Sequence, residues 1–215
     1  MAAWVIDEPG TKLKQPSILL THGSAGDKDS KGLIALSKAL TDKGHRVARV
    51  DLPYRTAGRA APPKAEASVE GFTQLFNKVS EGKGKWVVGG KSYGGRVASL
   101  AVAQGLPAAG LLLLSYPLHA PGRPDKLRAE HWPSIRVPCM IIQGSSDPFC
   151  TLELMEENLP TLGGRYVFEL VRGGDHSLKV SGKASATGKP STEAQTLTDL
   201  GQAICDWLSQ LGRTA

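Results

Sequence analysis

The sequence predicts a single α/β domain over residues 1–215, built on a mostly parallel sheet of about six or seven strands with helices on both faces. Short apolar runs without polar alternation, typical of strands buried on both faces, alternate with longer amphipathic stretches typical of helices. A chain of 215 residues, 40% apolar and 21% charged, is long enough to bury one full core, and no linker divides it.

Six apolar runs are the predicted strands, and a seventh run near the N-terminus is a further candidate. The six are Ser17–Thr21, Arg46–Asp51, Lys85–Gly89, Gly110–Ser115, Cys139–Gln143 and Arg165–Val171, and the seventh is Ala3–Ile6. Ligands of parallel sheets bind beyond the carboxyl ends of the strands. We therefore expect the functional residues in the loops that follow these runs.

Apolar side chains at helical spacing predict the helices between the strands. The predicted helices are Leu33–Leu40, Val69–Val79, the segment after Tyr93, Ser191–Leu211, and a short one near Asp125–Glu130. Thr192 and Gln195 have the spacing of a capping box at the start of the last of the long helices. The loop that contains the short helix leaves no room for a large cap domain.

The most informative stretch is Gly90-Lys91-Ser92-Tyr93-Gly94, which lies between a predicted strand and a predicted helix. In this context G-x-S-x-G indicates a serine on a sharp turn, with its hydroxyl exposed and the next amide pointing to the same space. Gly-Lys-Ser also ends a phosphate-binding P-loop, but that pattern needs glycine at position 85, where Lys85 stands. A glycine-rich turn without chemistry is the remaining alternative.

A serine needs a base, and in this arrangement an acid and then a histidine follow it along the chain. Asp147 and His176 each follow a predicted strand in a turn rich in glycine or proline. Asp175 competes with Asp147, but adjacent side chains diverge, so we expect it to be a loop residue. The histidines at 119 and 131 are expected at the surface, and the one at 45 in a structural role.

The loop Thr21–Gly26 follows the first of the six strand runs and is rich in glycine. Such a loop can aim backbone N–H groups at a substrate carbonyl oxygen. We expect the amides of Tyr93 and Ser24 to form this oxyanion hole, with Ala25 as the alternative second donor. His22 is expected to pack beneath the loop.

This set of motifs resembles the α/β-hydrolase superfamily over most of the chain. Three segments are most similar to those of compact dienelactone-hydrolase-like proteins, which include the KANL/Tex-type predicted hydrolases. They are Gly144-Ser-Ser-Asp-Pro-Phe149, Gly174-Asp-His-Ser177 and Asp51-Leu-Pro-Tyr54. The resemblance implies a hydrolase fold and a Ser92, Asp147, His176 triad. Dienelactone hydrolases carry a cysteine nucleophile, so Ser92 departs from them at that position.

These observations predict a serine hydrolase that cleaves carboxylic esters or thioesters through an acyl-enzyme. The alternative is a hydrolase-fold binding or scaffold protein with little or no turnover. The expected partner is a small acyl ester or thioester, and no cofactor, metal or nucleic acid is expected. Three scattered cysteines, no secretory signal and no apolar run of about 20 residues favour a cytoplasmic protein without a membrane span.

The positive charge balance is compatible with a nucleic acid, with an anionic substrate or with no charged partner at all. Lys and Arg number 26 against 20 Asp and Glu, a net charge of +6. Several cations fall in loops at the expected active end of the sheet, where they would attract an anionic acyl or leaving group. Ordinary solvated loop charge is the competing explanation. The cations are Arg55, Arg59, Lys64, Lys91, Arg123, Lys126, Arg128, Lys179, Lys183 and Lys189.

Overall fold

The computed structural model, which describes residues 2–185 and 188–213, contains one seven-stranded sheet in the order β1-β3-β2-β4-β5-β6-β7. The strands are β1 (Trp4–Asp7), β2 (Lys14–Thr21), β3 (His45–Val50), β4 (Trp86–Lys91), β5 (Gly110–Leu114), β6 (Cys139–Gly144) and β7 (Tyr166–Val171). All neighbours pair in parallel except β1, which runs antiparallel to β3. All seven predicted strands are present, with ends that differ by no more than three residues.

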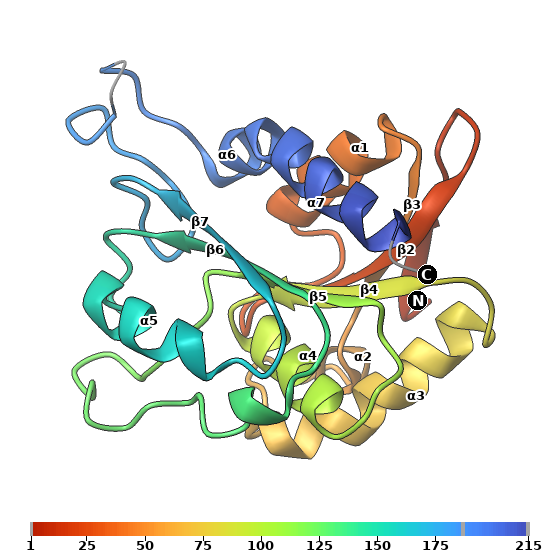
Figure 1. Ribbon diagram of the computed structural model, residues 1–215, viewed down its shortest axis with the longest axis horizontal. Helices are drawn as coiled ribbons and strands as arrows, with labels where there is room; N and C mark the ends of the chain where they lie inside the picture. The colour runs from red at the N-terminus through yellow and green to blue at the C-terminus, as the bar shows by residue number, and fades with distance from the viewer. Residues whose placement is uncertain (1, 186–187, 214–215) are drawn as a thin grey trace.

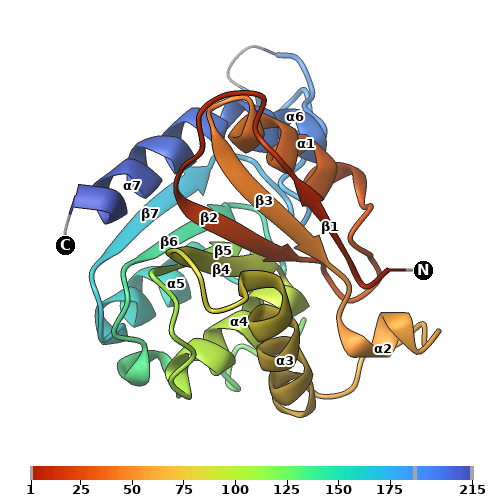
Figure 2. The same ribbon diagram turned by 90° about the vertical axis from the view of Figure 1, so that its right-hand side faces the viewer.

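Helices cover both faces of the sheet (Figure 1). One face carries α1 (Lys31–Thr41), α6 (Glu193–Asp199) and α7 (Gly201–Arg213), and the other carries α3 (Val69–Ser80), α4 (Tyr93–Ala103) and α5 (Leu152–Asn158). A short helix, α2 (Pro53–Thr56), follows β3 near the edge of the sheet (Figure 2). Each face has its own apolar cluster, so the sheet is buried on both sides, as the apolar strand runs predict.

Two helix predictions are wrong. The segment expected as one last helix is two, because α6 ends at Asp199 and α7 begins at Gly201. Residues 125–130 form turns and not a helix, and the only regular structure in that loop is a 3-10 helix at Trp132–Ser134. The predicted cap of α6 is confirmed in part, since the Thr192 side chain accepts a hydrogen bond from the Gln195 amide.

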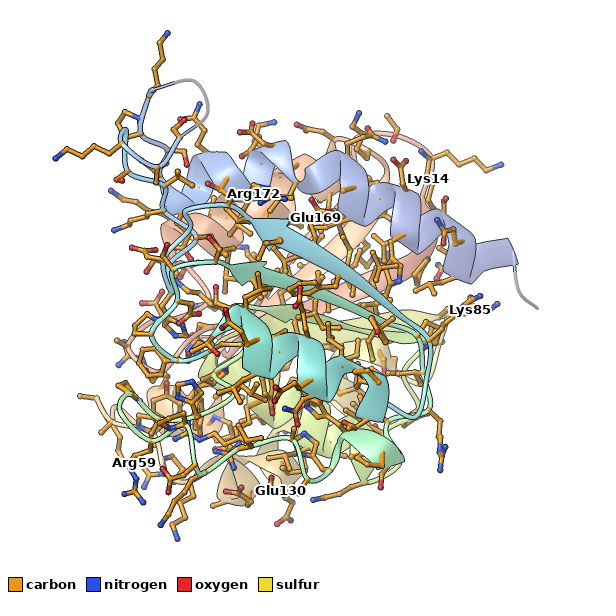
Figure 3. All side chains as sticks on the ribbon, turned by 60° about the vertical axis from the view of Figure 1, so that its left-hand side comes forward. Lys14, Arg59, Lys85, Glu130, Glu169 and Arg172 are labelled. Carbon is orange, nitrogen blue, oxygen red and sulfur yellow. The ribbon has the colours of Figure 1, made fainter. Side chains whose placement is uncertain are left out.

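Because the strands run parallel, the loops that hold Ser92, Asp147 and His176 all lie at the same end of the sheet. Figure 3 shows Lys14 and Lys85, where β2 and β4 begin, at the opposite end from Arg59, which follows β3 and α2. None of the helices in the described part of the chain is long and apolar enough to cross a membrane.

Candidate active site

Ser92 lies on a strained turn between β4 and α4. Its backbone has φ +50° and ψ −117°, a conformation that side chains rarely adopt. The glycines around it allow this turn: a Cβ at Gly90 would lie 2.4 Å from the Thr21 carbonyl oxygen, and a Cβ at Gly94 2.4 Å from that of His22. The motif's glycines are therefore required by close backbone approach, as the sequence predicts.

The Asp147 loop and the His176 loop are joined to each other. The amide of Ser146 donates to the carbonyl of Gly174 at 2.8 Å, and the amide of Gly173 donates to the Ser145 hydroxyl at 2.8 Å. Both loops follow neighbouring parallel strands, β6 and β7, so they leave the sheet side by side. This pairing holds the acid and the histidine in one place relative to the sheet.

The structure brings Ser92, His176 and Asp147 into one hydrogen-bonded row. Ser92 Oγ lies 2.8 Å from His176 Nε2, and His176 Nδ1 lies 2.7 Å from Asp147 Oδ2. The Asp147 side chain is fully buried, whereas that of His176 is 22% exposed. Asp175 stays in its own loop and accepts from the amides of Ser177 and Lys179, as predicted. The row places an imidazole nitrogen beside the serine hydroxyl and a carboxyl group on the far side of the imidazole.

Two residues that support this row escaped the sequence analysis. Gln143 donates from Nε2 to Asp147 Oδ2 at 2.6 Å, and the ring of Phe149 lies against the imidazole of His176, with centroids 4.1 Å apart and planes 30° apart. The Phe149 amide also donates to Asp147 Oδ1 at 2.8 Å. Their positions on either side of Asp147 were visible in the sequence, but neither motif nor periodicity marks their role.

The loop after β2 lies directly beside Ser92. A Cβ at Gly23 would be 3.7 Å from that of Ser92, and Ser24 is the next residue. In the described part of the chain, the amides of Ser24 and Tyr93 donate to no other group. The assignment of Ser24 as the second donor therefore stays a prediction.

Residues after β3 hold this loop from beneath. The Tyr54 hydroxyl donates to the Ser24 carbonyl at 2.8 Å, and burial raises the pKa of Tyr54 to about 12, so the phenol stays protonated. His22 is buried as predicted: its Nδ1 lies 2.8 Å from the Gly23 carbonyl, and its Nε2 accepts from the Leu52 amide at 3.2 Å. Burial lowers the pKa of His22, which suits a neutral ring with this tautomer.

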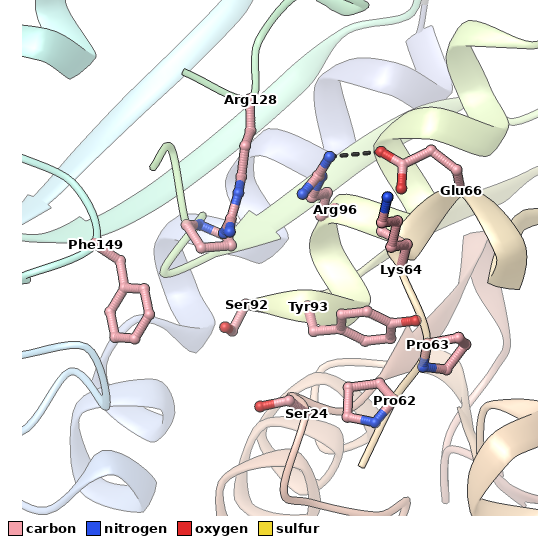
Figure 4. Close-up of a pocket in the computed structure, with 12 residues that line it drawn as sticks. Ser24, Pro62, Pro63, Lys64, Glu66, Ser92, Tyr93, Arg96, Arg128 and Phe149 are labelled. Carbon is pink, nitrogen blue, oxygen red and sulfur yellow. Dashed lines mark hydrogen bonds and ion pairs between the residues drawn. The ribbon is translucent and has the colours of Figure 1, made fainter. Parts of the chain in front are cut away.

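Two pockets meet at Ser92. The larger, a cleft of about 690 Å³, is lined by Ser24, Ser92, Tyr93, Phe149 and Arg128 among others, and Figure 4 shows Ser92 between Phe149 on one side and the Tyr93 ring on the other. The smaller, about 340 Å³, lies on the side of His176 and is also lined by Ser24 and Ser92. A compound bound at Ser92 could therefore occupy two separate spaces that meet at this residue.

Of the cations expected at the rim, three line these pockets. Lys64 and Arg128 line the larger cleft, together with Arg96, which the sequence analysis did not single out. Lys91 lines the smaller one and pairs with Glu193 of α6 at 2.6 Å, so its charge is neutralised. Among the described residues no group of three or more His, Cys, Asp or Glu side chains is arranged to hold a metal ion.

The expectation of surface histidines in the loop after β5 is wrong. His119 is 3% exposed, and its Nδ1 lies 2.9 Å from the Ala120 carbonyl. His131 is half-buried with Nε2 2.8 Å from the Ser99 hydroxyl, and burial lowers the pKa of His131 to about 4. His131 is drawn inward by its contact with Ser99 of α4, whereas Arg123 and Asp125 of the same loop stay exposed, and loop composition does not reveal which residues turn inward.

Residues 14–208 match the family of α/β-hydrolase domains. The chain belongs to the α/β-hydrolase family. A relative from Pongo abelii named "Putative protein-lysine deacylase ABHD14B" is 32% identical over 143 residues, which are 65% of this chain and 66% of that protein. The match thus spans just under two thirds of the relative's length.

Solved α/β-hydrolase structures share the fold at low sequence identity. A serine hydrolase homologue from Coxiella burnetii aligns with a TM-score of 0.73 and 18% identity, over 95% of this chain and 90% of that one. Est1E from Butyrivibrio proteoclasticus, solved with ferulic acid, gives 0.72 and 12% over 96% and 95%. A dienelactone hydrolase from Anabaena variabilis gives 0.68 and 19% over 98% and 92%.

Proposed function

We propose that this α/β-hydrolase family member is a serine hydrolase that cleaves carboxylic esters or thioesters through an acyl-enzyme on Ser92. The observation that carries the proposal is the continuous row from the Ser92 hydroxyl through His176 to Asp147, with contacts of 2.8 and 2.7 Å. A row of this kind supplies the base that a serine hydroxyl needs in order to attack a carbonyl.

The reaction has two halves that use the same groups. Ser92 Oγ forms a bond to the carbonyl carbon while His176 Nε2 takes its proton, and the buried Asp147 carboxylate stabilises the resulting imidazolium. His176 then gives that proton to the leaving alcohol or thiol as the C–O or C–S bond breaks. Water next attacks the acyl-enzyme, His176 takes its proton, and the acid and free Ser92 are released.

The amides of Ser24 and Tyr93 would donate hydrogen bonds to the negatively charged oxygen of the tetrahedral intermediate. Both belong to residues that line the cleft beside Ser92, and neither N–H has another acceptor among the described residues. In related chemistry each such donor contributes on the order of 3 kcal/mol to the transition state. Tyr54 supports this role by holding the Ser24 carbonyl, which fixes the peptide on that side of the loop.

A second candidate reaction is the removal of acyl groups from lysine side chains. It is favoured by the 32% identity to the Pongo abelii protein whose name describes such an activity. The same residues would act, with His176 protonating an amine as leaving group instead of an alcohol or thiol. The three buried, unpaired cysteines support a reducing, cytoplasmic setting for either reaction.

A fluorophosphonate probe and a substrate panel test the proposal. We expect the probe to label wild type and Ser134→Ala, which alters an exposed serine, but not Ser92→Ala. Turnover of short p-nitrophenyl esters and N-acetylcysteamine thioesters above that of an acyl-lysine peptide supports the first reaction, and the reverse order supports the second. A folded wild type that is neither labelled nor active would favour the binding or scaffold alternative.

A further inference from the structure

The larger cleft carries an excess of positive charge close to Ser92. Its charged lining residues are Lys64, Arg96 and Arg128 against a single acid, Glu66. In Figure 4 the three cationic groups lie along one side of the cleft, and the Ser92 hydroxyl and Ser24 lie along the other. A ligand bound between these two sides faces a reactive hydroxyl at one end and cations at the other.

The cations of this cleft differ in whether they have a partner. Arg96 pairs with Glu66 at 2.6 Å, although its Nε is buried without a hydrogen-bond partner in the described structure. The guanidinium of Arg128 has no acceptor and no carboxylate partner among the described residues. Glu66 therefore neutralises one of the two arginines, and Arg128 faces the cleft with its charge unpaired.

The backbone of Arg128 is held firmly, so its side chain projects from a fixed point. Its amide donates to the Leu118 carbonyl at 2.8 Å, and its carbonyl accepts from the Tyr116 hydroxyl at 2.6 Å. Tyr116 is fully buried, and burial raises the pKa of Tyr116 to about 12, which keeps the hydroxyl a donor. The backbone of Arg128 is thus anchored to Tyr116 and Leu118, which follow β5 directly and are buried in the core.

An unpaired guanidinium in this position is electrostatically unsatisfied. Burial and the like charge of Arg96 both lower the pKa of Arg128. A ligand carboxylate would supply the missing acceptor, and a guanidinium can bind it through two parallel N–H···O bonds. Lys64, which is exposed and has no ion pair in the described structure, would add to the attraction.

We propose that the larger cleft binds an acyl group that ends in a carboxylate, with Arg128 as the partner of that carboxylate. The substrates would be monoesters or monothioesters of short dicarboxylic acids. This inference rests on the proposed function, because it assigns the two pockets by the reaction. His176, which returns the proton to the leaving group, lines the smaller pocket, so the larger cleft is left for the acyl group.

The reaction remains hydrolysis, and the carboxylate takes no part in it. The thioester C–S bond breaks, the thiol leaves with the proton from His176, and water completes the release of the dicarboxylic acid. The distal carboxylate stays ionised and paired with Arg128 throughout. Its contribution is to binding and orientation, which raises kcat/KM for acyl groups of the right length.

A matched pair of thioesters measures this contribution. The probes are glutaryl- and pentanoyl-N-acetylcysteamine, which differ in a terminal carboxylate against a methyl group, with succinyl and adipyl thioesters to test length. We expect wild type to prefer the glutaryl thioester at least tenfold in kcat/KM. The preference should fall on the order of 10- to 100-fold in Arg128→Met, the range for a hydrogen-bonded charged pair.

The control removes a charge from the same loop without touching the cleft. Arg123 is exposed and pairs with Asp125 at 3.3 Å, so Arg123→Met should leave the glutaryl preference within about twofold. Arg128→Lys keeps the charge but not the planar fork and should give an intermediate preference. A wild type that hydrolyses the pentanoyl thioester equally well, or a preference that survives in Arg128→Met, would overturn the inference and leave the proposed function standing.

Binding of glutarate to the inactive variant Ser92→Ala, measured by thermal shift, tests the carboxylate site without any turnover. Stabilisation by glutarate that disappears in Ser92→Ala/Arg128→Met supports carboxylate binding in the cleft independently of turnover. If wild type is neither labelled by the fluorophosphonate nor active on any thioester, the proposed function fails, and the substrate assignment fails with it. An absence of glutarate binding beside normal pentanoyl turnover counts against the carboxylate site alone.

Discussion

Replacing Asp147 with asparagine exchanges one carboxylate oxygen for an NH₂ group at a point where only donors converge. Oδ2 accepts from Gln143 Nε2 at 2.6 Å and from His176 Nδ1 at 2.7 Å, and Oδ1 accepts from the Phe149 amide at 2.8 Å. Asparagine has one oxygen for these three donors. If that oxygen keeps the hydrogen bond from the Phe149 amide, the new NH₂ group of the asparagine faces the N–H groups of Gln143 and His176.

The energetic cost follows from the two lost hydrogen bonds. Each charge-assisted bond contributes about 1.5–3 kcal/mol to stability. A flip of the Gln143 amide, whose Oε1 has no partner, recovers part of this loss, and so does the removal of a buried charge. We expect Asp147→Asn to lower the free energy of unfolding by roughly 2 kcal/mol.

The effect on activity should be far larger than the effect on stability. An NH₂ group beside Nδ1 favours the imidazole tautomer that carries its proton on Nε2, and that tautomer cannot accept the proton of Ser92. A loss in kcat on the order of 10⁴ is expected.

The assay compares p-nitrophenyl acetate hydrolysis and urea unfolding of Asp147→Asn with those of Asp175→Asn. Asparagine at 175 keeps the oxygen that accepts from the two loop amides, so its kcat should change by about threefold at most. More than a tenth of wild-type kcat in folded Asp147→Asn, or equal losses in both variants, would refute the reasoning.

Three further predictions concern the surroundings of the site. Tyr54→Phe removes the bond to the Ser24 carbonyl and should lower kcat/KM roughly 3- to 10-fold with little change in KM; an unchanged kcat would rule out the positioning role. Gly94→Ala would place its Cβ 2.4 Å from a backbone oxygen, whereas Gly10→Ala meets nothing within 4 Å. Urea unfolding should therefore show a loss of about 3 kcal/mol or more for the first and almost none for the second. The pKa of His131 is lowered to about 4 from 6.5, so the unfolded chain binds the extra proton and stability falls as the pH drops from about 6.5 to about 4. Discounted for partial exposure, this is about 1–2 kcal/mol at pH 4, and His131→Gln should show a shallower decline; equal slopes would contradict the assignment.

The order of strands and helices was readable from the sequence because the physical signals are local. A strand buried on both faces needs an unbroken apolar run, as in Gly110–Leu114, where every residue is buried. A sharp turn packed against a neighbouring strand needs residues without a Cβ, which is why Gly90 and Gly94 marked the position of Ser92. The prediction of one final helix failed because the apolar spacing continues through the break, from Leu197 to Ile204, although Gly201 directly follows the C-cap residue of α6.

The sequence by itself determined the fold class and the three strand-end loops that hold Ser92, Asp147 and His176. Only the tertiary structure decided how these side chains meet and what surrounds them, including the donors on Asp147 and the unpaired Arg128 beside Glu66-bound Arg96. The reason is that periodicity and turn chemistry report neighbours along the chain. Hydrogen-bond partners and the pairing of charges depend on which distant segments pack together, and no local pattern carries that information.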